Sequence, residues 1–149
     1  MPITQAMVTS FKTESFNGIH NFGTGVTRAT TAADTFKIAL YTSSATLDAS
    51  TTLYSTSNEV TGTGYTAGGN ILVISQVPTS TGTTAYLSFA TSTWTSASFT
   101  AAGALIYNST QGGKVVAVLN FGGNQTVSGG DFNILFPTSS STTAILRFE

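Results

Sequence analysis

Apolar and polar residues alternate with two different periods along this chain. Near the N-terminus, apolar residues recur about every 3.6 positions, which is the spacing of one face of an α-helix. These residues are Val8, Phe11, Phe16, Ile19 and Phe22. Thr9 or Ser10 can cap the start of the helix, and Gly18 and Gly23 weaken and then end it. The pattern therefore predicts a short amphipathic helix that docks on a sheet.

From residue 35 onward the period changes to two, which is the period of a β-strand. In residues 35–41 every second side chain is large and apolar, so this strand is expected to bury one face and to leave the other partly wet. Further strands are predicted at 71–75, 84–90, 104–107, 115–121, 132–136 and 144–148. Each of these runs is short, rich in β-branched or aromatic residues, and bounded by Gly, Asn, Ser or Pro.

Short strands that follow one another without helical segments between them argue against a parallel sheet. The predicted fold is all-β: an antiparallel β-sandwich or jelly roll with one short N-terminal helix. Residues 1–149 are expected to form a single β-sandwich domain, with 1–22 as an N-terminal arm and helix and 23–34 as a loop. Gly112-Gly113 and Gly129-Gly130-Asp131 are turn signals between apolar runs, as in hairpins.

The amino-acid composition indicates a subunit whose surface is covered by other proteins, rather than an ordinary free-standing domain. Only 7% of the residues are charged while 40% are hydrophobic, and no Asp, Glu, Lys, Arg or His occurs between Glu59 and Lys114. A free-standing surface is normally about a quarter charged. Here Ser and Thr replace the charges, and a neighbour can cover such residues at less cost in desolvation. The chain is therefore expected to pack into a larger assembly.

The same composition argues against several classes of function. A formal net charge of −1 and a pI near 5.7 offer no basic surface for nucleic acid. The chain has no cysteine, so disulfides and thiol chemistry are absent. It also shows neither a signal-peptide pattern nor a long apolar run, so no membrane association is expected. No cofactor and no metal site is expected.

Catalytic motifs are weak throughout. His20 is the single histidine, and it is interpreted as a helix-end or interface residue rather than a base. Residues 62–67 match the glycine spacing of a dinucleotide-binding turn, but a strand rather than a helix is predicted to follow, so they are interpreted as a loop. The six carboxylates lie far apart in sequence, which leaves a spatial pair open. The protein is not expected to be an enzyme.

Aromatic residues offer a different possibility. Trp94, with Tyr54, Tyr65 and Tyr86, could form the flat platform of a glycan-binding module, although packing in a core or interface is the more common role. The residues selected as possible interface contacts are Phe11, Phe16, His20, Tyr54, Tyr65, Trp94 and Tyr107.

Several long strings carry a resemblance to a known family. They are SFKTESFNGIHNF at 10–22, TFKIALY at 35–41, TSSATLDASTTLYSTSNEVTGTGYTAGG at 42–69, ALIYNST at 104–110, GGKVVAVLNFGG at 112–123 and FNILFP at 132–137. In these strings, which cover most of the chain, it resembles a family of small virion proteins of tailed double-stranded DNA bacteriophages. Residues 23–33 depart from the family as a longer insertion, which is interpreted as a contact loop. The resemblance implies a particle component, without specifying its place in the particle or any binding residue.

Composition and resemblance together predict a capsid decoration or cement protein, assembled in the host cytoplasm and located in the virion. Its expected partners are the major capsid protein or other virion proteins and further copies of itself. The expected homo-oligomer is a dimer or trimer, with the contact in residues 71–107. The alternatives are a tail, baseplate or fibre-associated protein and a glycan-binding module.

Overall fold

The computed structural model describes residues 2–16, 18–23 and 32–149. Within these residues the chain forms one helix, α1 (Thr9–Phe16), and two antiparallel sheets. The prediction of an all-β, sandwich-like fold with one short N-terminal helix is confirmed, while its jelly-roll form stays a prediction. No helix in the described ranges has the length and apolar character needed to cross a bilayer.

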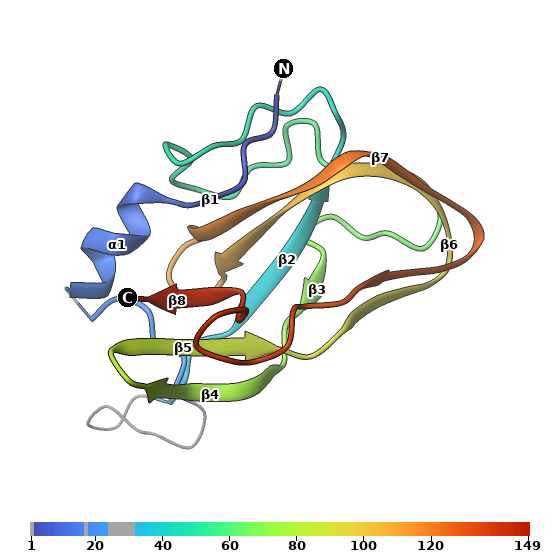
Figure 1. The fold of residues 1–149 in the computed structure, drawn as a ribbon. Coiled ribbons are helices and arrows are strands. Elements are labelled where there is room, and N and C mark those ends of the chain that lie inside the picture. The colour runs from blue at the N-terminus through green and yellow to red at the C-terminus, as the bar shows by residue number, and fades with distance from the viewer. Residues whose placement is uncertain (1, 17, 24–31) are drawn as a thin grey trace.

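The larger sheet has five strands in the order β1-β7-β6-β2-β3. These strands are β1 (Ala6–Met7), β2 (Phe36–Tyr41), β3 (Asn70–Ile71), β6 (Ser92–Asn108) and β7 (Lys114–Ile134). The smaller sheet has the order β4-β5-β8 and contains β4 (Ile74–Thr81), β5 (Thr84–Phe89) and β8 (Leu146–Phe148). Figure 1 shows the smaller sheet below the larger one, with α1 beside β8.

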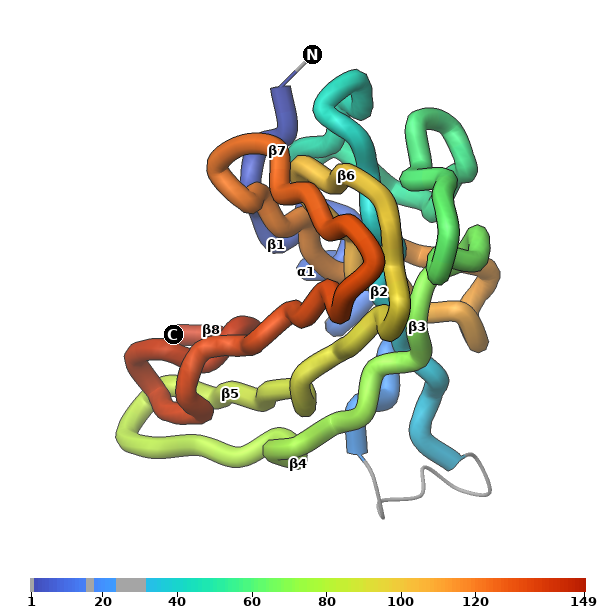
Figure 2. The backbone as a smooth tube through the Cα atoms, turned by 90° about the vertical axis from the view of Figure 1, so that its right-hand side faces the viewer, coloured from blue at the N-terminus to red at the C-terminus, as the bar shows by residue number. Residues whose placement is uncertain are grey.

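The hairpin of β6 and β7 connects the two sheets. Its strands have 17 and 21 residues. They are far longer than the predicted strands at 104–107 in β6 and at 115–121 and 132–136 in β7. Register shifts interrupt the pairing, and one of them lies between Trp94 and Ala97. Such bulges bend a strand, and Figures 1 and 2 show both strands curving so that their far ends reach the smaller sheet.

Of the two glycine-containing turns predicted in this hairpin, one is present and the other is not. Gly112 and Gly113, with φ of 68° and 81°, form the turn between β6 and β7, so that prediction is confirmed. The turn predicted at 129–131 is wrong, because these residues lie inside β7 and Gly130 pairs with Ala97. Gly129 has a φ of 64°, and in this position the left-handed backbone accompanies a bulge instead of a reversal.

The helix ends earlier than predicted: it stops at Phe16 and is capped at Gly18, whereas Gly23 was predicted to end it, so Ile19 and Phe22 lie beyond the helix. The backbone N of Gly18 donates to the Ser15 carbonyl at 3.2 Å, and that of Ile19 donates to the Glu14 carbonyl at 3.0 Å. With Gly18 at a φ of 67°, this is the pattern of a Schellman cap. The predicted loop 23–34 falls largely on residues 24–31, which are outside the described residues, as is the side chain of Phe16.

The core lies on both faces of β2. Phe36, Ile38 and Leu40 are buried, but so are Ala39 and Tyr41 on the opposite face. The prediction of a partly wet second face is therefore wrong. Segment 42–69 covers this face, since the Tyr41 hydroxyl donates to the carbonyl of Ser55 and the ring of Tyr54 stacks on Tyr107 with centroids 4.5 Å apart.

Candidate functional site

The selected interface residues lie mostly inside the protein. Phe11, Trp94 and Tyr107 are buried in its core, and Tyr54 and Tyr65 are half-buried in contact with that core. They therefore offer a partner little surface in the isolated subunit. Trp94 stacks against Tyr65 with centroids 6.1 Å apart, so it does not form an exposed platform for a sugar. Phe16 cannot be placed in this way, because its side chain is outside the described residues.

His20 occupies a polar cluster between α1 and the larger sheet. Its Nε2 lies 2.6 Å from Oε2 of Glu14, and its Nδ1 lies 3.0 Å from Nδ2 of Asn108. The same Asn108 amide donates to Oδ2 of Asp34 at 2.7 Å, which fixes the orientation of the amide. The ring therefore accepts at Nδ1 and donates from Nε2. Both ring nitrogens are engaged within the fold, so this geometry favours a structural role for His20.

Glu59 forms the second polar cluster. Its carboxylate accepts hydrogen bonds from the hydroxyl of Tyr54 at 2.7 Å, the hydroxyl of Tyr65 at 2.6 Å and the backbone N of Gly68 at 2.7 Å. Burial is the main cause that raises the pKa of both phenols, and their hydrogen bonds to Glu59 raise it further. A buried carboxylate with several donors holds a fold together, so the cluster fixes segment 42–69 on the sheet.

The glycine-rich run at 62–67 belongs to this same structural unit. It is followed by β3 and not by a helix, so its interpretation as a loop is confirmed. The hydroxyl of Tyr65 in this run accepts a hydrogen bond of 2.9 Å from the backbone N of Leu40. Among the residues that the structure describes, no group of three or more His, Asp or Glu side chains has the arrangement of a metal site.

Three of the exposed aliphatic side chains lie close together in the sequence. Ile71, Val73 and Val77 are 65%, 64% and 45% exposed. Large apolar side chains are normally inside a protein, and a group of them on the surface indicates a contact site. We call these three residues the aliphatic edge.

The aliphatic edge follows the border of both sheets. Ile71 lies in β3, the last strand of the larger sheet, and Val77 lies in β4, the outer strand of the smaller one. Natural outer strands are usually protected by charged residues, but the whole run 60–113 contains none. Pro78 in β4 has no N–H to donate to an added strand. The edge is therefore suited to contact through side chains rather than through strand pairing.

The sequence predicted a contact within residues 71–107, a range that includes these three residues without singling them out. No local signal distinguishes them, because Ile71 and Val73 belong to the continuous apolar run 71–74, in which Leu72 is buried. Comparisons with known protein families, curated proteins and solved structures find no match to this chain. The fold, the surface and the resemblance of its sequence strings are therefore the basis of the function proposed below.

Proposed function

We propose that this protein is a structural subunit of a bacteriophage virion, and specifically a decoration or cement protein of the capsid. The single observation that carries the proposal is the aliphatic edge within a run that has no charged residue. The resemblance to small virion proteins supports the same assignment. In this role the protein bridges neighbouring capsid subunits and stabilises the shell.

The physical basis of the proposal is repetition of a modest contact. Three aliphatic side chains bury little area by themselves, so one contact of this kind is weak. On a shell that offers many equivalent sites, once a bridging subunit has bound one neighbour, its contact with the next is intramolecular and has a high effective concentration. The Glu59 cluster supports this role, because it holds segment 42–69, which directly precedes β3, in one position.

The test is to locate the protein in the mature particle by cryo-electron microscopy and to count its copies. We expect many copies on the outer shell, each in contact with more than one capsid subunit. A small number of copies at the tail or baseplate would overturn the capsid assignment while keeping the virion assignment. Absence of the protein from purified particles would overturn both.

A reconstitution experiment tests the role of the aliphatic edge directly. Particles prepared without the protein are mixed with the wild type or with Val73→Lys, and the temperature at which the shell releases DNA is measured. We expect the wild type to raise this temperature and Val73→Lys to raise it less. Thr126→Lys, which adds the same charge at an exposed position of β7 outside the edge, is the matched control and should behave as the wild type.

A further inference from the structure

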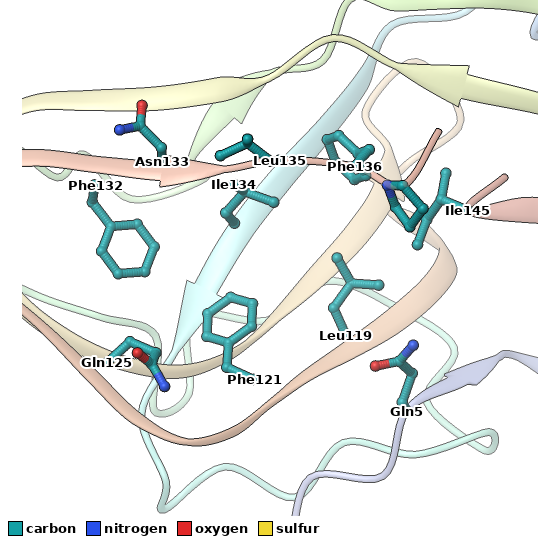
Figure 3. A pocket seen from close by; sticks show the side chains of 11 residues that line it. Gln5, Leu119, Phe121, Gln125, Phe132, Asn133, Ile134, Leu135, Phe136 and Ile145 are labelled. Carbon is teal, nitrogen blue, oxygen red and sulfur yellow. The ribbon is translucent and has the colours of Figure 1, made fainter. Parts of the chain in front are cut away.

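A hollow of about 510 Å³ opens between two parts of β7 that are distant in sequence. In Figure 3, Leu119 and Phe121 from the first part point toward Phe132 and Ile134 from the last part. Gln5 and Gln125 also line the hollow and are exposed to solvent. Its volume is within the range of sites that bind small molecules.

The walls of the hollow are aromatic. Phe121, Phe132 and Phe136 all line it and are all half-buried. Phe132 packs against Phe99, whose ring centroid is 5.1 Å away, and the ring centroid of Phe121 lies 6.2 Å from that of Phe132. The rings are therefore supported from the core and still present a surface to the hollow.

The polar groups of the hollow are amides. Gln5 is oriented by the backbone N of Asn120, which donates to its Oε1 at 3.2 Å, and its Nε2 group is left to donate. Gln125 is exposed, and its side-chain amide has no hydrogen-bond partner among the described residues. No Asp, Glu, Lys, Arg or His lines the hollow. An amide both donates and accepts, so the lining suits a ligand that is polar but uncharged.

An added peptide strand does not fit this edge of β7. The backbone N of Asn120 is taken by Gln5, and the backbone N of Gly122 donates to Oδ1 of Asn120 at 2.8 Å. The side-chain amide of Asn120 also donates to the carbonyl of Ile3 at 2.7 Å. Strand addition depends on free backbone groups, and two of the backbone N–H groups next to the hollow are already used.

We propose that this hollow binds a neutral oligosaccharide. A sugar ring has an apolar face of C–H groups that packs on aromatic rings, and hydroxyls that both donate to and accept from amides. A phosphate or an acidic sugar would find no cation in the lining to neutralise it. The site is separate from the aliphatic edge, and the proposal does not depend on the role in the capsid.

The test is titration of the ¹⁵N-labelled full-length protein with neutral oligosaccharides, followed by NMR. The probes are maltotetraose, cellotetraose, lacto-N-tetraose and N,N′,N″-triacetylchitotriose, with sialyllactose as the charged comparison. We expect at least one neutral probe to shift the amide signals of Phe121, Gln125 and Phe132, and sialyllactose to leave them unchanged. We expect Gln125→Ala to weaken binding by up to about tenfold, the effect of one lost hydrogen bond.

The controls separate binding from folding. Phe121→Ala should abolish the shifts, and its amide spectrum shows whether the fold is retained. Gln76→Ala, which changes a glutamine on β4 outside the hollow, should bind as the wild type. Lack of response to every neutral probe at millimolar concentration, or shifts confined to residues outside the hollow, would overturn the proposal. Binding of an uncharged peptide at these residues, without any response to sugars, would also overturn it.

Discussion

The hydroxyl of Tyr65 donates a hydrogen bond of 2.6 Å to Oε1 of Glu59, and both residues belong to segment 42–69. The same Tyr65 oxygen accepts from the backbone N of Leu40 in β2. A loop residue is thereby connected to the central sheet and to the one buried carboxylate of its own segment. The cluster gives a long loop with little regular structure a fixed position.

Replacement of this carboxylate is expected to be severely destabilising. Glu59→Ala leaves two phenol hydroxyls and one backbone N–H without an acceptor, and each such group costs about 1–3 kcal/mol when buried. We therefore expect the free energy of unfolding to fall by at least about 3 kcal/mol. Chemical denaturation followed by tryptophan fluorescence measures this change, because Trp94 lies in the core next to Tyr65.

The matched control for this change is Glu149→Ala, because the side chain of Glu149 is 73% exposed. Removal of an exposed carboxylate should change stability by less than about 0.5 kcal/mol. Equal and small effects of the two substitutions would show that the cluster contributes little to the fold.

Stability is expected to fall at alkaline pH. Burial is the largest cause that raises the pKa of Tyr41, Tyr54, Tyr65 and Tyr107, and the charge of Glu59 raises it further for each. For Tyr107 the pKa is raised to about 12. A phenol in the unfolded chain ionises near pH 10. The contribution of these four phenols to the free energy of unfolding is therefore complete below about pH 10. It is lost as the pH rises through their pKa values in the folded protein.

Denaturation midpoints across this pH range, together with tyrosinate absorbance, measure the effect. We expect these four phenols to ionise mainly as the protein unfolds, so the two transitions should coincide. Tyr107→Phe removes one of these phenols and should make the fall in stability with pH less steep. Ionisation of all the tyrosines near pH 10 with the fold intact would contradict the expectation.

Gly69 is a position that no other residue should fill. Its φ is 71°, and a β-carbon placed there would lie 1.8 Å from the carbonyl oxygen of Ile38. Gly69→Ala should therefore destabilise the protein by more than about 3 kcal/mol, because the backbone must move to relieve the contact. Gly82→Ala is the matched control, since Gly82 has a similar φ of 62° but nothing within 4 Å. That variant should cost only about 1 kcal/mol, and equal losses in thermal unfolding would contradict the steric explanation.

Much of the fold was predictable because the strands alternate and are bounded by turn residues. Residues 35–41 and 84–90 were found within one residue of β2 and β5. The first half of β6 was missed, because Ser92–Ala102 is rich in Ser, Thr and Ala and lacks the strong apolar alternation of a half-buried strand. The burial of Tyr41 was also missed, since it depends on where segment 42–69 folds back and not on the local pattern.

The candidate surface was less predictable than the fold. The uncharged run between Glu59 and Lys114 contains the aliphatic edge, but aromatic residues were selected as contacts and the structure buries Trp94 and Tyr107. Large aromatic rings gain the most from burial, so composition alone does not separate an aromatic contact from a core residue. The hollow beside Phe121 was not expected either, because it depends on the return of β7 toward its own first part.

The aliphatic edge is expected to control self-association of the purified protein. If copies associate through this edge, Val73→Lys places a charge in the contact and should raise the dissociation constant by at least about tenfold. The fold should be unaffected, because Val73 is 64% exposed. Sedimentation equilibrium over a range of concentrations measures the constant, and thermal unfolding checks that stability is retained. Thr126→Lys controls for the added charge, and because it also removes the hydrogen bond between the Thr126 and Thr100 hydroxyls, its thermal unfolding is measured too. A wild-type protein that stays monomeric at high concentration would contradict self-association, and equal effects of the two lysines would exclude the edge as its site.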